Sequence, residues 1–354
     1  MRLHLLCGTT KGAFLFTSDG DRRRWQVAGP LFKGQAVYAL ACARGRFYAA
    51  THSPHWGAVV SLSDDLGATW TAPERAPIRF PEGSGDALRQ IWQIVPRDDG
   101  TVYAGVEPAA LFVSRDAGET WSLVRGLYEH PHRKEWQPGG GGLCLHTVIP
   151  QGRRMFCAIS AAGVYRSDDG GETWQARNVG IRAPFLAPGN QYPEFGQCVH
   201  KMAAHPSQPA RLYLQHHWGV YRSDDGGDSW QSIGAGLPSD FGFALVVHPR
   251  DGETLWILPL ESDEFRAAPN ARLRVYRSRD GGRSFAALTE GLPQEGAYEA
   301  VLRDAMAADA LEPAGVYFGT RSGKLYASRN EGDAWSRIAD GLPPIVCVKT
   351  GVTD

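Results

Sequence analysis

Short runs of alternating or β-branched apolar residues recur along the whole chain, separated by Gly, Asp and Pro. One stretch contains three such runs in succession, at residues 143–149, 154–159 and 163–166, and the pattern returns at 315–319 and 324–327. Runs of this length and composition predict β-strands joined by turns. With a further strand after each third run, the pattern predicts units of four strands, named A to D in chain order.

An eight-residue segment follows strand C of most units. Its clearest copies are Ser167–Trp174 and Ser223–Trp230, and other copies begin at Ser63, Ser114, Ser278 and Ser328. Successive copies begin 51, 53, 56, 55 and 50 residues apart, and a near-constant period of this size predicts stacked supersecondary units. The residue types suit a turn, because Asp and Ser side chains accept hydrogen bonds from nearby N–H groups and Gly adopts left-handed conformations.

The pattern S-x-D-x-G-x-T-W resembles the Asp-box, also called the bacterial neuraminidase (BNR) repeat. The resemblance covers nearly the whole chain and implies that each copy is the hairpin between strands C and D of a β-propeller blade. The family includes sialidase-like, sortilin-like and photosystem II assembly factor-like propellers. Two copies are degenerate, since Phe285 replaces Trp in one, and Asn330 and Ala334 depart from the pattern in another.

A seventh, degenerate copy begins at Thr17. Its unit has strands at Leu3–Cys7 and Ala13–Phe16 but no strand A before them, and the chain end supplies one at Ile345–Lys349. Pairing this C-terminal strand with the N-terminal blade removes an exposed sheet edge. We therefore predict an all-β fold, a single seven-bladed β-propeller of four-stranded antiparallel blades over residues 1–354, in which blade 1 combines 1–30 with 345–354.

Composition narrows the functional classes. The net charge is −1 with 21% charged residues, so no basic surface indicates nucleic-acid binding. No apolar stretch has the length of a membrane span, and Met1 leads directly into a strand-like segment, so we expect a cytoplasmic protein that does not enter membranes. The six cysteines fall in predicted strands A or B without C-x-x-C spacing, which predicts buried, reduced thiols.

The two rims of the predicted propeller differ in composition. The Asp-boxes lie on one rim, where their acids are expected to serve the turns. Loops that join D to the next A, and B to C, share the other rim, and these loops are long and rich in His, Trp, Arg and Glu. Long irregular connections in a compact fold are often functional, so we expect the functional site at this rim.

Two histidines occupy the same position in strand A of consecutive blades, in Cys144-Leu145-His146 and Cys198-Val199-His200. Equivalent positions on inner strands lie near each other around the channel. Each ring is then either a hydrogen-bonded core group or a ligand in a shared metal site. His216 and His217 alternate faces on a strand, so at most one of them joins the site. The metal hypothesis predicts one divalent transition metal held by His146, His200 and one of the other two.

Four tryptophans outside the Asp-boxes map to the same rim, where they either pack loops or line a ligand site. The candidate ligand-binding residues are Trp56, Trp92, Trp136, Trp218 and Arg321. The candidate catalytic residues are Glu107, Glu135, Glu194 and Arg303. For Arg303 a structural ion pair with Asp304 is the alternative.

These residues support two functional hypotheses. The first is an enzyme that acts on a small molecule or glycan in a funnel at this rim, with metal-bound water as the nucleophile and a carboxylate as acid or base. The second is a non-catalytic propeller that binds a protein or peptide. True sialidase activity is not expected, because the chain lacks the Arg-Ile-Pro motif and a recognisable arginine triad of that family.

Overall fold

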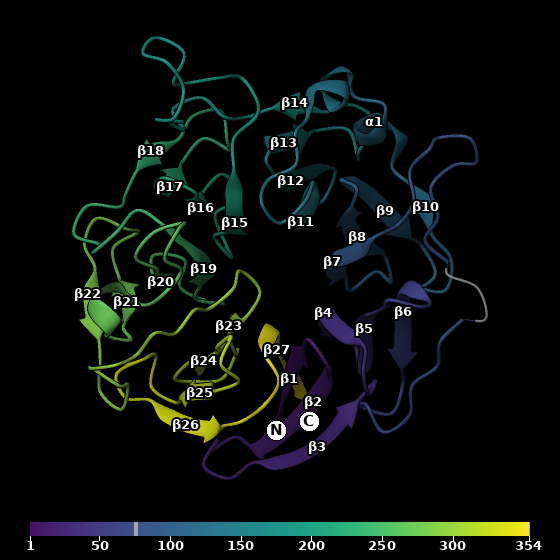
Figure 1. Cartoon of the computed structure of the whole chain (residues 1–354). Helices are drawn as coiled ribbons and strands as arrows, with labels where there is room; N and C mark the ends of the chain where they lie inside the picture. Colours follow the sequence, from purple (N-terminus) through teal and green to yellow (C-terminus); the bar gives the residue numbers. More distant parts are fainter. Residues whose placement is uncertain (74–76, 354) are drawn as a thin grey trace.

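Seven β-sheets are arranged in a ring in the computed structural model, which describes residues 1–73 and 77–353 (Figure 1). Within the described residues, six of the sheets have four strands and one has three. In the three-stranded sheet, a single bridge between Leu62 and Thr71 lies where the fourth strand would be. The predicted all-β, seven-bladed propeller is confirmed.

In blades 1 to 4, strands that follow one another in the chain pair with each other, and β27 joins blade 1 from the far end of the chain. Blade 1 contains β27 (Ile345–Thr353), β1 (Arg2–Thr9), β2 (Gly12–Asp19) and β3 (Gln26–Leu31). Blade 2 contains β4 (Ala36–Ala43), β5 (Arg46–Ser53) and β6 (Gly57–Ser63). Blade 3 contains β7 (Gln90–Pro96), β8 (Val102–Glu107), β9 (Ala110–Ser114) and β10 (Ser122–Leu123). Blade 4 contains β11 (Cys144–Gln151), β12 (Arg154–Ser160), β13 (Gly163–Ser167) and β14 (Gln175–Ala176).

Blades 5 to 7 follow the same plan. Blade 5 contains β15 (Val199–Ala204), β16 (Leu212–His216), β17 (Gly219–Ser223) and β18 (Gln231–Ser232). Blade 6 contains β19 (Gly242–Val247), β20 (Leu255–Pro259), β21 (Val275–Ser278) and β22 (Ala286–Leu288). Blade 7 contains β23 (Met306–Ala308), β24 (Val316–Gly319), β25 (Leu325–Ser328) and β26 (Ser336–Ala339).

The helical segments are short and lie in loops. They are α1 (Arg125–Tyr128) and the 3-10 helices η1 (Pro131–Glu135) and η2 (Pro269–Ala271). Over the described residues, none of the helices is both long enough and apolar enough to cross a lipid bilayer.

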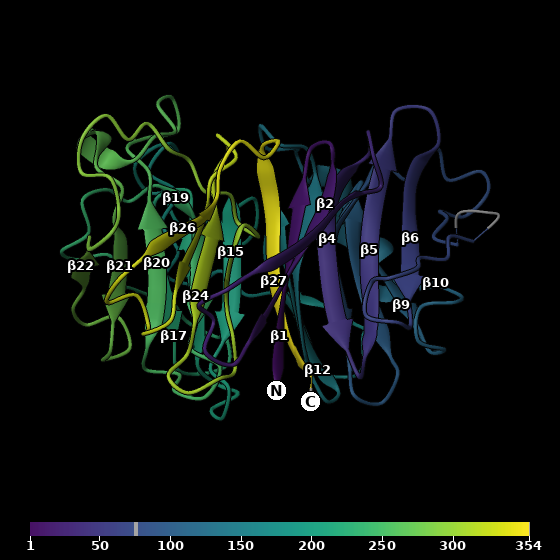
Figure 2. The same ribbon diagram turned by 90° about the horizontal axis from the view of Figure 1, so that it is seen from below.

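The C-terminal strand closes the ring. β27 is the innermost strand of blade 1 and pairs with β1 along its length, with Leu5 opposite Thr350. β27 also contacts β4 of blade 2 and β23 and β24 of blade 7. Figure 2 shows β27 beside β1 and both chain ends at the same edge of the ring. The predicted closure is confirmed, and the strand extends beyond the segment expected from the sequence.

Each Asp-box stabilises its own turn. In blade 4 the Ser167 Oγ accepts a hydrogen bond of 2.8 Å from the Gly171 N–H, and the Asp169 carboxylate accepts one of 3.0 Å from the Thr173 N–H. The same serine contact, 2.8 Å long, recurs in the boxes of blades 2, 3, 5, 6 and 7. These acids and hydroxyls are therefore used within the turns, on the rim opposite the long loops.

The innermost strands carry a β-bulge near the rim that bears the long loops. The register shifts by one residue at the same place in β4, β7, β11, β15, β19 and β27. A bulge leaves one residue unpaired in the ladder and turns its side chain. The bulged residues are Tyr38, Trp92, His146, His200, Phe243 and Val346. All of them except His146 line the cavity at this rim, so the bulges position the candidate site.

Candidate functional site

A cavity of about 420 Å³ opens at the rim that bears the long loops. We call this cavity the funnel. The bulged residues of the inner strands form part of its wall, and residues of the D–A and B–C loops form the rest, among them Gly139–Gly141, Phe185, Trp218 and Asp263. The volume lies within the range of about 300–1,000 Å³ that small-molecule sites occupy.

One wall of the funnel combines two aromatic rings with an arginine. The rings of Tyr38 and Trp92 meet edge to face, with centroids 5.3 Å apart. The guanidinium carbon of Arg303 lies 5.2 Å from the centroid of Trp92, within the distance of a cation–π interaction. The Nη1 atom of Arg303 is buried and has no hydrogen-bond partner in the described part of the chain. This wall therefore presents a flat apolar surface beside an unsatisfied cationic donor.

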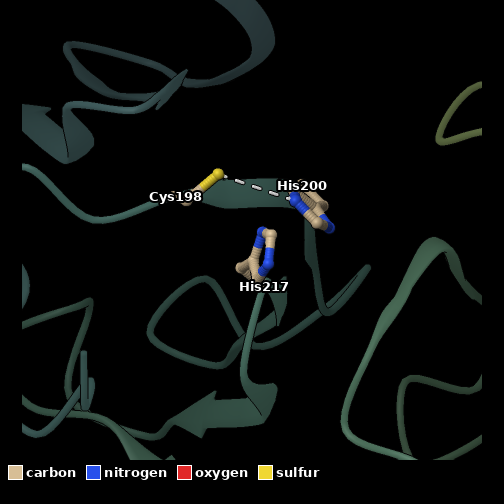
Figure 3. A group of neighbouring side chains, drawn as sticks. All are labelled: Cys198, His200 and His217. Atoms are coloured by element: carbon tan, nitrogen blue, oxygen red, sulfur yellow. Dashed lines mark hydrogen bonds between the residues drawn. The ribbon is translucent and has the colours of Figure 1, made fainter. Parts of the chain in front are cut away.

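A cluster of Cys198, His200 and His217 also lines the funnel (Figure 3). The Cys198 Sγ lies 3.6 Å from the His200 Nε2. The other ring nitrogen of His200, Nδ1, lies 2.6 Å from the Gly242 carbonyl oxygen and therefore carries the proton. Burial lowers the pKa of His200 well below its ordinary value, so this ring is neutral at neutral pH.

His217 completes the cluster from the loop after β16. Its Nε2 lies 3.5 Å from the Asp263 Oδ2, and its ring packs 4.1 Å from the Trp218 ring. Burial lowers the pKa of His217, and the Asp263 carboxylate opposes this effect. His217 thus combines partial exposure to the funnel with a carboxylate partner.

Asp304 also lines the funnel, but two lysines hold it in the ionised form. Its Oδ1 accepts hydrogen bonds from the Lys201 Nζ at 2.8 Å and the Lys349 Nζ at 2.7 Å. Burial raises the pKa of Asp304, and the two ammonium groups more than offset this, so the pKa lies well below the usual range of Asp. Asp304 stays ionised at neutral pH and cannot donate a proton to a leaving group.

Six of the residues predicted from the sequence line the funnel. They are Trp92, Trp218, Arg303, Arg321, His200 and His217. Glu107 contacts Trp92 from outside the funnel, where its Oε2 accepts a hydrogen bond of 3.2 Å from the Trp92 Nε1. Glu107 therefore orients a wall residue and does not itself line the funnel.

The structure places His146 and His216, two of the predicted metal ligands, outside the lining of the funnel. The His146 ring is fully buried and uses both nitrogens, with Nε2 2.8 Å from the Val199 carbonyl oxygen and Nδ1 3.1 Å from the Thr147 Oγ1. The His216 ring is also fully buried, and its Nδ1 accepts a hydrogen bond from the Trp218 N–H. Neither ring lines the funnel, because each is turned toward backbone groups of its own or the next blade.

Four other candidates lie away from the funnel. Trp136 is buried and donates a hydrogen bond of 2.8 Å to the Tyr165 hydroxyl, so it packs a loop against blade 4. Trp56 is 84% exposed. Glu135 and Glu194 are exposed on the rim loops, with Glu194 4.0 Å from His132. None of the four is among the residues of the funnel wall.

Several residues of the funnel escaped the sequence reasoning, notably Tyr38, Phe185, Cys198 and Phe243. The sequence spacing could have predicted Tyr38, because Tyr38, Trp92, His146 and His200 lie at intervals of 54 residues. The Cys-x-His spacing before β15 was another signal, since residues two apart on an extended segment share a face. No pattern in the sequence marks Phe185.

Comparison with known proteins identifies the repeat and gives weak likeness over longer stretches. A family model for the BNR/Asp-box repeat matches residues 112–123 and 165–176, so the chain carries BNR/Asp-box repeats. The oligoxyloglucan-reducing end-specific xyloglucanase of Emericella nidulans is 27% identical over 231 residues, which cover 58% of this chain and 27% of that enzyme. The chain spans about a quarter or less of the length of the curated relatives it matches.

Solved structures that share the fold include a GH74 enzyme and YCF48. The GH74 enzyme of Niastella koreensis superposes with a TM-score of 0.63 and 16% identity, covering 94% of this chain and 51% of that one. The structure of YCF48 bound to D1 peptide superposes with a TM-score of 0.54 and 13% identity, covering 86% of this chain and 82% of that one. At these identities the likeness concerns the propeller alone.

Proposed function

We propose that the funnel binds and hydrolyses a small ring-bearing molecule of the sugar type that carries an anionic group. The observation that carries this proposal is the wall of Tyr38, Trp92 and Arg303 inside one cavity. Aromatic rings present large apolar faces on which a flat or ring-shaped ligand stacks. A guanidinium group matches the geometry of a carboxylate or phosphate with two parallel hydrogen bonds.

The charge inside the funnel favours an anion. Arg266, Arg303 and Arg321 line the wall, and Arg266 is paired with Asp263. Asp304 is matched by two lysines, so it does not neutralise the remaining arginines. A buried donor without a partner, such as the Arg303 Nη1, costs free energy that an anionic ligand would recover.

The groups able to take part in a reaction gather in one cluster of the funnel lining. Cys198, His200 and His217 lie there, with Asp263 beside His217. A ligand stacked on Trp92 would share one cavity with these groups, and Arg303, which lies against Trp92, is close enough to His200 for its charge to lower the pKa of that ring. The similarity to a xyloglucanase and to a GH74 propeller favours a sugar among ring-bearing ligands.

A second function is a non-catalytic propeller that binds a peptide or protein at the same rim. The observation that favours it is a set of exposed aromatic side chains in the rim loops: Trp56, Phe185, Tyr192, Phe265 and Tyr298. Aromatic residues are enriched at the energetic centres of protein interfaces. The structural likeness to YCF48, solved with a bound peptide, agrees with this alternative.

Isothermal titration calorimetry tests the binding step of the primary proposal with three probes: a xyloglucan oligosaccharide, glucuronic acid and glucose 6-phosphate. We expect saturable binding of an anionic probe. Arg303→Gln should weaken that binding about 10- to 100-fold, the worth of a hydrogen bond to a charged group. Trp92→Ala should weaken binding of any sugar probe.

Trp56→Ala is the matched control, because Trp56 is exposed and lies outside the funnel. This variant should bind the probes as the unmodified protein does. Failure of all three probes to bind, or loss of binding in Trp56→Ala alone, would overturn the proposal. Rim binding of a peptide that Trp56→Ala weakens and Arg303→Gln leaves unchanged would support the second function instead.

A further inference from the structure

We propose that Cys198, His200 and His217 bind one divalent transition metal ion of the zinc type, with a further coordination position open to the funnel. One ligand atom from each residue lies within 4.8 Å of the others, and Figure 3 shows the three side chains converging. This inference goes beyond the proposed function, because it concerns a metal ion and can be tested without any organic ligand.

The distances are close to those of a formed site. Zinc bonds of about 2.3 Å to sulfur and about 2.0–2.1 Å to nitrogen, at tetrahedral angles, place ligand atoms roughly 3.3–3.7 Å apart. The Cys198 Sγ and the His200 Nε2 are 3.6 Å apart and thus already have this spacing. The third ligand atom, on His217, needs a shift of only about 1 Å, which a half-buried side chain can make by a small rotation.

Neighbouring groups hold the imidazoles in the form that a metal requires. The Gly242 carbonyl oxygen fixes the proton of His200 on Nδ1, which leaves the Nε2 lone pair directed at Cys198. The Phe243 ring stacks on His200 with centroids 4.5 Å apart and restricts its rotation. Asp263 lies against His217, the usual place of a carboxylate that orients a metal-bound imidazole.

The donor set selects the class of metal. One thiol sulfur and two imidazoles suit zinc, cobalt or copper, whereas magnesium and calcium require oxygen ligands. Copper sites with a His2Cys set commonly add a methionine, and none of the described residues that line the funnel is a methionine. Three protein ligands with an open fourth position are typical of zinc sites that activate water or polarise a ligand oxygen.

Blade 4 contains an incomplete copy of the same cluster. Cys144 and His146 occupy the positions of Cys198 and His200, 54 residues earlier. The position equivalent to His217 is Ser160, which pairs with Cys144 in the sheet. The thiol of Cys144 lies 3.0 Å from the Gly141 carbonyl oxygen, and the His146 Nε2 contacts the Val199 carbonyl oxygen. Cys144 of blade 4 therefore has the same local surroundings as Cys198, but it should bind no metal.

Titration of the metal-free, reduced protein with Co²⁺ tests the proposal, because a thiolate ligand gives Co²⁺ a charge-transfer band in the near ultraviolet. We expect one Co²⁺ per chain with this band, and displacement by Zn²⁺. Cys198→Ser should abolish the band, and His217→Gln should lower the affinity sharply. Asp263→Asn should lower the affinity about 10- to 100-fold by removing the partner of His217.

Cys144→Ser is the matched control and should keep both the band and the stoichiometry. The proposal is overturned if Co²⁺ does not bind, if the band survives in Cys198→Ser, or if it disappears in Cys144→Ser instead. Rapid alkylation of Cys198 by iodoacetamide, equally fast with and without added Zn²⁺, would also contradict it. Thermal unfolding of each metal-free variant checks that a lost band does not reflect a lost fold.

Discussion

The Nζ atom of Lys201 lies 2.8 Å from the Oδ1 atom of Asp304, and this contact joins the inner segments of blades 5 and 7. Lys349 of blade 1 reaches the same oxygen at 2.7 Å. Asp304 is nearly fully buried and Lys201 is largely so, while Lys349 is partly exposed. A buried ion pair holds its partners in one arrangement, and removing one partner leaves an uncompensated charge.

Asp304→Asn should therefore destabilise the fold by about 3–5 kcal/mol, because Lys201 would remain buried without a counter-ion. Urea unfolding at neutral pH measures this loss. The control is Glu129→Gln, which removes an exposed ion pair with Arg125 and should cost less than about 1 kcal/mol. Equal stability of the two variants would mean that the three blades are not held by this contact.

His146 predicts a pH dependence of stability. Burial lowers the pKa of His146 well below the value of about 6.5 that it has in the unfolded chain. Below pH 6.5 the unfolded state binds a proton that the folded state excludes, so this residue makes stability fall as the pH falls. Between pH 7.5 and pH 5 the loss from one such histidine reaches up to about 2 kcal/mol.

His146→Gln should remove this component, so that the variant loses less stability than the unmodified protein between pH 7.5 and pH 5. Urea unfolding of both proteins at the two pH values gives the comparison. His55→Gln, at an exposed position, should change stability at pH 7.5 by no more than about 0.5 kcal/mol and controls for the substitution itself. A steeper acid loss in the His146 variant would contradict the burial of a neutral ring.

The fold could be predicted because its determinants are local. The hydrogen bonds of each Asp-box lie within eight residues, as Ser167, Asp169 and Thr173 show, so the repeat can be recognised from the sequence alone. The ring closure was equally accessible, because the first unit lacks an inner strand and the chain end supplies an apolar one. Both inferences required only the spacing of turns and strands.

The site was only partly predictable, because the direction of an inner-strand side chain depends on the bulge and on the next blade. His146 and His200 occupy equivalent positions, yet only His200 lines the funnel. The carbonyl oxygen of Val199 binds the ring of His146 through Nε2, whereas that of Gly242 binds His200 through Nδ1 and leaves Nε2 facing the Cys198 Sγ. This difference in side-chain direction arises from contacts between blades, and the spacing of residues in the sequence does not predict it.

Ile345 predicts how strongly the C-terminal strand holds the ring. This side chain is fully buried and packs against Gly319 of blade 7, where an added Cβ would lie 2.3 Å from the Ile345 Cγ2. Ile345→Ala should cost about 2–5 kcal/mol, as expected for truncation of a buried isoleucine. Val352→Ala, near the exposed end of the same strand, should change stability by no more than about 0.5 kcal/mol. Thermal or urea unfolding measures both, and comparable losses would contradict the closing role of Ile345.

Trp136 tests the distinction between a packing tryptophan and a ligand-binding one. Its Nε1 donates a hydrogen bond of 2.8 Å to the Tyr165 hydroxyl, and the whole indole is 5% exposed. Trp136→Phe removes the donor and keeps most of the apolar surface, so the free energy of unfolding should fall by about 1–3 kcal/mol. Because Trp136 does not line the funnel, affinity for the sugar probes should not change. Trp92→Phe should show the reverse pattern, with weaker probe binding and a smaller loss of stability. If Trp136→Phe instead binds the probes less tightly at unchanged stability, Trp136 belongs to the ligand site.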